Sequence, residues 1–272
     1  MILQFHTPAF PLNTIVDSFT FYEGLIHEHS IERLLPDGSS NLIIELDNIP
    51  KYTFDNDSLE VKEKYLGAWI SGMQKQFISI GAEVGSSMLI IRFQPAGPYS
   101  VFGIPMYELN DKVLDADLIL GTEIRTLRDQ LLGAPTGTEK FNIVEQWIGS
   151  FLKEQPHSID MIRYATKEIS KNPTLKHVKT LSDRFGYSQK QFIQLFKTQV
   201  GLTPKYFQRI IRFNKVLEEL EAKKQVNWTR LSQDCGFYDQ AHFIREFRQF
   251  SGFNPQEFLR AEREYKNYVI VA

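Results

Sequence analysis

The chain has 272 residues, a formal net charge of −2 and 42% hydrophobic residues. This composition is that of an ordinary globular protein, and it excludes the collagen-like, low-complexity and disulfide-scaffold classes. The near-neutral total conceals two halves of opposite charge, because residues 1–160 carry a net charge of −11 and residues 161–272 one of +9. This asymmetry favours a nucleic-acid or membrane-surface partner for the basic half.

Three features of the sequence indicate the cellular compartment of the protein. Cys235 is the single cysteine, so neither an intrachain disulfide nor a cysteine-rich metal site is expected. No apolar run approaches the ~18 residues of a membrane-spanning helix, and residues 1–6 lack the basic segment of a signal peptide. We therefore expect a cytoplasmic protein with no membrane partner and no cofactor.

Short apolar runs separated by turn-forming residues predict a β-rich domain over residues 1–135. Three such runs are Leu42–Leu46, Phe77–Ile80 and Met88–Phe93, and turn signals such as Pro36-Asp37-Gly38 separate them. Several short strands at this spacing are typical of a sandwich or barrel.

From Thr122 onward the hydrophobic period changes to that of helices. Two amphipathic helices are expected, one over residues 122–133 and one that follows a turn at residues 134–137 and ends near Pro156. The charge changes sign near this proline, which places a domain boundary there. We therefore predict a two-domain α+β protein with a β-rich domain (1–135), a helical connector (136–157), an all-α domain (158–265) and a tail (266–272).

The basic half contains an internal repeat of about 50 residues. Gly186 aligns with Gly236, and after one inserted residue Phe192, Phe196, Gly201 and Pro204 align with Phe243, Phe247, Gly252 and Pro255. Each unit is predicted to be a short helix, a glycine turn and a second helix, whose N-cap is Ser188 or Asp239. A helix-turn-helix of this kind can place its second helix in a DNA major groove. A helix over residues 203–221, roughly 27 Å long, would hold the two second helices near one DNA turn apart.

The outward faces of the two second helices carry side chains that can read bases. With the phenylalanines inward, the residues that point away are Lys190, Gln191, Gln194 and Lys197 in the first unit and Ala241, His242, Arg245, Arg248 and Gln249 in the second. Lys and Arg bond to guanine, Gln bonds to adenine, and a small Ala admits a thymine methyl group. A solvated helix face is the alternative for one such helix, but two equivalent faces in a basic region favour DNA.

The second unit, residues 236–255, resembles the second helix-turn-helix of the AraC/XylS family of bacterial transcription regulators. The first unit, from Gly186 to Pro204, fits the same family pattern, and the resemblance extends over residues 158–265, about 40% of the chain. It implies that these residues bind DNA sequence-specifically, and that the base-facing positions are Lys190, Ile193, Gln194, Gln240, Ala241, His242 and Arg245. The helical-face argument selects neither Ile193 nor Gln240.

The N-terminal half resembles the uncharacterised β-rich domains that precede this DNA-binding module. The residues that carry this similarity are 35–38, 91–97, 102–105 and 108–109. In the wider family such domains sense small molecules or dimerise the protein. We therefore expect double-stranded DNA as the partner, and we consider a small-molecule effector, a second copy of the chain and RNA polymerase as further partners. Trp69 and Arg92 could line an effector cavity.

Two alternative functions follow from other features. A non-specific architectural DNA binder would bind promoter and random DNA almost equally. A metal-dependent, cupin-like enzyme with a DNA-binding domain is suggested by His27-Glu28-His29 and Glu32, since both imidazoles would share one face of a strand. The next histidine after His29 is His157, so the further ligand of a cupin is missing. We expect a surface pair here, no metal site and no enzymatic activity, and we expect Cys235 in the core.

Overall fold

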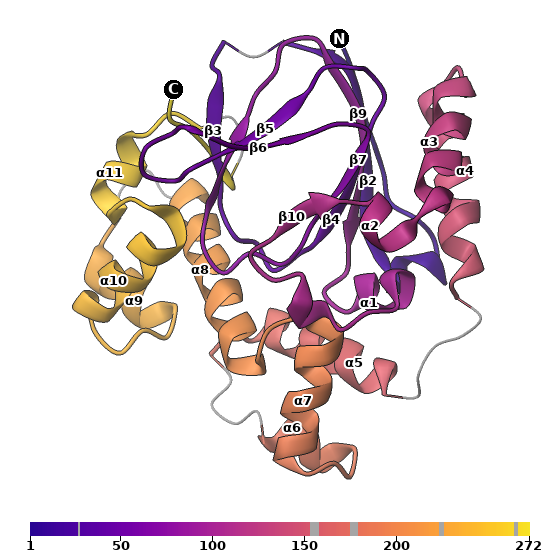
Figure 1. Ribbon diagram of the computed structural model, residues 1–272. Coiled ribbons are helices and arrows are strands. Elements are labelled where there is room, and N and C mark those ends of the chain that lie inside the picture. The colour runs from indigo at the N-terminus through magenta and orange to yellow at the C-terminus, as the bar shows by residue number, and fades with distance from the viewer. Residues whose placement is uncertain (27, 153–157, 175–178, 223–225, 264–265) are drawn as a thin grey trace.

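The computed structural model describes residues 1–272 except 27, 153–157, 175–178, 223–225 and 264–265. Its N-terminal part is built from two antiparallel sheets (Figure 1). The first sheet has the strand order β1 (Ile2–His6), β2 (Val16–Leu25), β9 (Ser86–Phe93), β4 (Asn41–Glu45), β7 (Ala68–Ser71) and β10 (Val113–Asp115). The second has the order β11 (Tyr268–Ile270), β3 (Ile31–Leu34), β8 (Ile78–Gly81), β5 (Lys51–Phe54) and β6 (Val61–Tyr65). The predicted β-rich N-terminal domain is confirmed.

Helices cover the face of the first sheet that points away from the second. The helices α3 (Thr122–Gly133) and α4 (Gly137–Ser150) lie along that sheet in Figure 1. They enclose one core with it, to which Ile124 and Val144 contribute from the helices and Leu89 and Ile91 from β9. The segment predicted as a connector therefore includes α4, which packs onto the β-rich domain. Shorter elements complete this region: η1 (Leu12–Thr14), α1 (Gly97–Phe102), η2 (Met106–Glu108) and α2 (Asp117–Leu120).

The C-terminal part is helical, as predicted. Its elements are α5 (Ile159–Lys171), α6 (Lys179–Arg184), α7 (Gln189–Val200), α8 (Pro204–Ala222), α9 (Trp228–Asp234), α10 (Gln240–Ser251) and α11 (Pro255–Arg260). Ser188 caps α7 and forms the expected capping box with Gln191, while Asp239 caps α10. In Figure 1, α6 and α7 lie below α8, and α9, α10 and α11 lie along its side. None of the helices in the described part of the chain is both long and apolar enough to cross a bilayer.

The two parts share a core rather than meeting only through a linker. Leu35 and Met73 of the β-rich part are buried in the same cluster as the phenylalanines of the helical part. Hydrogen bonds across the boundary include Asn110 Nδ2 to the Gly201 carbonyl (2.6 Å), Tyr206 Oη to the Lys75 carbonyl (3.0 Å) and Asn214 Nδ2 to the Pro36 carbonyl (2.9 Å). The helix α8 therefore rests directly on the β-rich domain.

The prediction that residues 266–272 form only a tail is wrong. Tyr268–Ile270 form β11, which pairs antiparallel with β3 and joins the second sheet. A three-residue strand has too short an apolar pattern to be distinguished from a polar tail by periodicity alone. The C-terminal end of the chain therefore belongs to the β-rich part.

Gly38 is expected to be a sensitive point of the contact between the two parts. Its φ of +82° disfavours any side chain, and a Cβ there would lie 3.1 Å from the Phe207 ring and 3.2 Å from Ile211 on α8. Gly67 is a matched control, because its φ is +91° but a Cβ would meet open space. We expect Gly67→Ala to lower the free energy of unfolding by about 1 kcal/mol. Gly38→Ala should cost roughly 1 kcal/mol more because it also crowds α8. Urea unfolding measures both free energies. If the two variants lose the same free energy of unfolding, the contact between Gly38 and α8 can accommodate an added methyl group.

Candidate DNA-binding surface and interior cavity

The N-terminal half of α7 presents the first candidate reading face. Phe192 and Phe196 are completely buried, and this fixes the rotation of the helix. Lys190, Gln191 and Gln194 are exposed on the opposite side, as predicted. These side chains carry the donors and acceptors that major-groove base edges require.

The C-terminal half of α7 faces the β-rich domain instead. The Lys197 ammonium lies 5.6 Å from the centre of the Tyr107 ring, and the side chain is half-buried. Ile193 is also half-buried, so the position taken from the resemblance lies at the edge of the exposed face. Of the five candidates on α7, three are therefore exposed and two are partly covered.

The helix α10 presents the second candidate reading face. Phe243, Phe247 and Phe250 are buried beneath it. Its exposed candidates are Gln240, Ala241, Arg245, Arg248 and Gln249. Ala241, Ile244, Arg245, Arg248 and Gln249 line a shallow hollow on its outer side. Within the described residues neither Arg245 nor Arg248 makes an ion pair, so both guanidinium groups are available to a polyanion.

His242 and Gln249 are engaged within the protein. The His242 ring packs edge-on against Phe237, and its Nε2 lies 3.6 Å from a carboxylate oxygen of Glu246. The Gln249 side chain accepts a hydrogen bond from Arg209 Nη2 (2.9 Å) and donates one to Tyr206 Oη (3.2 Å). Reading a base with either side chain would require these contacts to be given up.

A buried carboxylate fixes α10 onto α8, and the sequence analysis did not identify it. The side chain of Glu246 is 5% exposed and forms ion pairs with Arg209 and Arg212, the second at 3.4 Å. Arg212 also donates a hydrogen bond from Nη1 to the Gly236 carbonyl in the turn of the second unit (3.0 Å). Burial lowers the pKa of Arg212, and the negative charge of Glu246 opposes that shift. The available signal was an acidic residue on the phenylalanine face of an otherwise basic helix.

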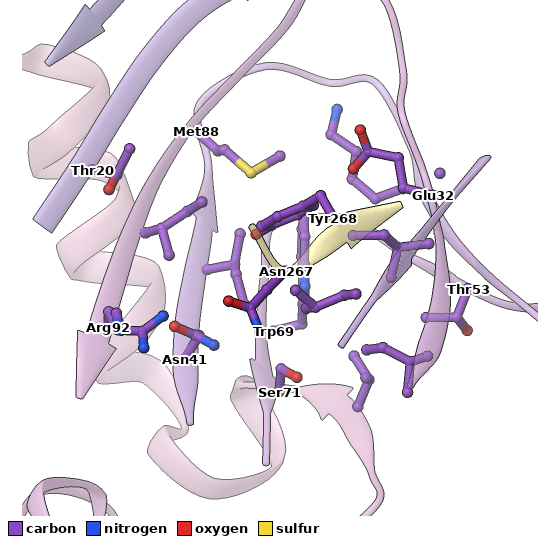
Figure 2. A pocket seen from close by; sticks show the side chains of 18 of the residues that line it. Thr20, Glu32, Asn41, Thr53, Trp69, Ser71, Met88, Arg92, Asn267 and Tyr268 are labelled. Atoms are coloured by element: carbon purple, nitrogen blue, oxygen red, sulfur yellow. The ribbon is translucent and has the colours of Figure 1, made fainter. Parts of the chain in front are cut away.

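A cavity of about 430 Å³ lies between the two sheets of the β-rich domain. Successive residues of β9 alternate, so that Leu89 and Ile91 pack under the helices while Met88, Ile90 and Arg92 line the cavity. Figure 2 shows the side chains of Trp69, Met88 and Tyr268 around it. Its wall is largely apolar and aromatic, with a few charged groups, as in many small-molecule sites.

Trp69 and Arg92, the two candidates for an effector site, both line this cavity. Trp69 is 9% exposed, and its ring centre lies 6.0 Å from that of Tyr65. The Arg92 guanidinium forms ion pairs with Asp37 and with Asp17, the second at 3.3 Å. Burial alone would lower the pKa of Arg92, but the two aspartates raise it above its ordinary value. The cavity therefore contains a fixed positive charge that is held by its own carboxylates.

The residues of the suggested metal triad lie only partly within the described chain. His27 lies outside the described residues, and His29 Nε2 lies 2.5 Å from Glu32 Oε1. No group of three or more His, Cys, Asp or Glu side chains suited to a metal occurs among the residues that the structure places. Cys235 is buried in the helical core, as expected.

Comparison with known proteins identifies the C-terminal part. Residues 181–261 match the family model "Helix-turn-helix domain", which is of the AraC type and spans both units. The chain is also 23% identical over 263 residues to the probable transcriptional regulator LumQ of Photobacterium leiognathi, with 94% of this chain and 98% of that protein covered. The chain is a DNA-binding transcription regulator with an AraC-type helix-turn-helix domain. Residues 4–115 match a domain of unknown function, DUF6597, which agrees with the predicted resemblance of the N-terminal half.

Solved structures with some similarity include regulators from bacteria. ToxT of Vibrio cholerae has 10% identity and a TM-score of 0.44, covering 89% of this chain and 96% of that one. ToxT with bound unsaturated fatty acid has a TM-score of 0.43 at the same identity, covering 89% of this chain and 94% of that one. The AraC-like transcriptional activator CuxR has 15% identity and a TM-score of 0.26, covering 80% of this chain and 86% of that one.

Proposed function

We propose that this AraC-type regulator reads one DNA site with both α7 and α10, placed in successive major grooves on one side of the duplex. The proposal rests on two equivalent exposed faces, one on α7, which precedes α8, and one on α10. The helix α10 packs on the side of α8 through Arg209 and Arg212, so α8 joins the two units and holds both faces in place.

The exposed side chains supply the reading contacts in this proposal. Lys190, Gln191 and Gln194 act on α7, and Gln240, Ala241, Arg245 and Arg248 act on α10. Base-edge contacts carry the sequence preference, and contacts to phosphate fix the position of the protein on the duplex. The basic net charge of residues 161–272 supports this division of roles.

Selection of bound sites from random duplexes tests sequence specificity. The expected product is a motif with two conserved segments separated by roughly one helical turn, about 10 base pairs. Recovery of sequences without any enriched motif would favour the architectural alternative, in which affinity depends on phosphates alone.

The two lysines of α7 should differ in their effect on DNA binding. Lys190 is exposed, whereas Lys197 lies over Tyr107 of the β-rich domain. Lys190→Ala should therefore weaken binding and lower the slope of log affinity against log salt by up to about one unit. Lys197→Ala should leave that slope nearly unchanged. Titrations at three salt concentrations measure both slopes, and equal slopes in the two variants would contradict the placement of Lys197.

The cavity of the β-rich domain is the proposed site of a small organic effector that modulates DNA binding. Its volume of about 430 Å³ is in the range of small-molecule pockets, and Trp69 and Arg92 offer an aromatic face and a charge. A second copy of the chain and RNA polymerase are the further partners expected for a non-enzymatic regulator in the bacterial cytoplasm. Sedimentation of the complex with a selected duplex would count the copies bound.

A further inference from the structure

The last strand of the chain lies between the cavity and the DNA-binding helices. In β11, Tyr268 pairs with Leu34, Val269 with Arg33 and Ile270 with Glu32 of β3. Lys266, Asn267 and Tyr268 are part of the cavity wall. Figure 2 shows β11 in yellow crossing the cavity, with Asn267 and Tyr268 near Trp69.

Backbone hydrogen bonds hold this strand in a single register. The Leu35 amide donates to the Asn267 carbonyl at 2.8 Å, and the Val271 amide donates to the Ile31 carbonyl at 3.0 Å. The Ile31 amide donates in turn to the carbonyl of Ala272, also at 3.0 Å. The strand β11 is therefore paired with β3 at both of its ends.

The two faces of β11 meet different parts of the protein. Because side chains alternate along a strand, Tyr268 faces the cavity while Val269 faces the opposite way. Val269 is completely buried in the core of the helical part. Beside it, the Arg33 guanidinium lies 4.8 Å from the ring centre of Phe253, which follows α10. A change in the position of Tyr268 is therefore transmitted to side chains that pack against the helix-turn-helix units.

Polar contacts connect the same segment directly to α8. Asn267 Nδ2 donates a hydrogen bond to Asn214 Oδ1 at 3.0 Å, and Lys266 Nζ donates one to Glu218 Oε1 at 2.9 Å. Both acceptors lie on α8, which also carries the two arginines that hold α10 through Glu246. The path from the cavity wall to the second reading helix thus runs through hydrogen bonds to α8, along α8 itself, and through its ion pairs to Glu246.

We infer that β11 couples occupancy of the cavity to the placement of α8, and through α8 to DNA binding. A ligand shifts an equilibrium only if it binds the two states differently. A molecule in this cavity would bind the two states differently, because Tyr268 forms part of the cavity wall only while β11 is paired with β3. The inference rests on the proposed role of the cavity as an effector site and specifies how that site acts on the DNA-binding helices.

A cavity-filling substitution can stand in for the unidentified ligand. Ser71 of β7 lines the cavity and is buried, so Ser71→Phe places a ring inside it. Thr126→Phe, on the exposed face of α3, is the matched control. In the full chain we expect Ser71→Phe to change affinity for a selected duplex by about fivefold or more, the usual lower range of allosteric coupling, and Thr126→Phe to leave it unchanged.

Removal of the strand then tests the route. In a chain that lacks residues 266–272, Ser71→Phe should no longer change DNA affinity. If deletion compromises folding, Lys266→Ala with Asn267→Ala cuts the contacts to α8 and retains Val269. The fivefold effect of Ser71→Phe should shrink in that background as well. An effect of undiminished size in both backgrounds, or no effect of Ser71→Phe in the full chain, overturns the inference.

Amide hydrogen exchange separates failure of this inference from failure of the proposed function. Exchange at the Leu35 and Val271 amides reports pairing of β11 without any DNA. We expect Ser71→Phe to accelerate exchange at both amides. A protein with no selected DNA site but accelerated exchange would refute the proposed DNA reading and leave the link between cavity and strand intact. Unchanged exchange would refute the link itself.

Discussion

Replacement of Arg245 by alanine is expected to lower affinity for a selected DNA site by about 1–3 kcal/mol, roughly 5- to 150-fold, and affinity for random DNA far less. Arg245 is exposed on α10 above the buried Phe243 and Phe247, so its helix is rigidly mounted. Within the described chain no acidic side chain competes for its guanidinium. A rigidly mounted arginine can make a bidentate contact with guanine, and this contact is lost when the base is wrong.

Arg248 provides the comparison for Arg245. It is exposed on the same helix one turn closer to the C-terminus, where contact with phosphate is expected. Arg248→Ala should weaken selected and random duplexes about equally and flatten the salt slope by about one unit. The affinities of both variants for selected and random duplexes, measured at three salt concentrations, distinguish a base contact from a phosphate contact. If Arg245→Ala lowers both affinities by the same factor, Arg245 contacts phosphate and the proposed reading face is wrong.

Replacement of Glu246 by alanine should destabilise the fold by about 2–4 kcal/mol. The substitution leaves Arg209 and Arg212 partly buried without their carboxylate, and uncompensated charge in such places is costly. The midpoint of thermal unfolding should fall by roughly 5–15 °C for a chain of this size. Because the carboxylate orients α10, affinity for a selected duplex should fall even at temperatures where the variant is folded.

An exposed ion pair in the same domain is the control for Glu246. Asp234 pairs with Arg230 on α9 at 3.6 Å, and both side chains are more than half exposed. Asp234→Ala should therefore change stability by no more than about 0.5 kcal/mol. A loss for Glu246→Ala as small as that for Asp234→Ala would mean that water replaces the carboxylate and that α10 is held by its phenylalanines alone.

The helical half was predictable because its signals are local. Ser188 and Gln191 form a capping box within four residues, and the phenylalanine spacing of α10 alone sets which side chains are exposed. Exposure of Arg245 and Arg248 follows from that spacing, and exposure of Lys190 and Gln194 follows from the spacing of Phe192 and Phe196 on α7. The resemblance to the AraC/XylS motif independently predicted that the same region binds DNA, and the match of residues 181–261 agrees with it.

Contacts between distant segments were not predictable from the same signals. The placement of Lys197 over Tyr107 depends on how the β-rich domain docks against α7, and no periodicity encodes that docking. The pairing of Glu246 with Arg209 joins residues 37 positions apart. Likewise, β11 pairs with β3 across more than 230 positions of sequence. Its three residues are too few for hydrophobic alternation to predict a strand.

Footprinting of the full chain on a selected duplex tests the central claim most directly, namely that α7 and α10 read one site together. The account predicts protection of two major-groove segments on the same side of the duplex, about 10 base pairs apart. Lys190→Ala should weaken protection of one segment and Arg245→Ala protection of the other. Protection of a single segment, or loss of the same segment in both variants, would show that only one of the two helices reads DNA and would contradict the account.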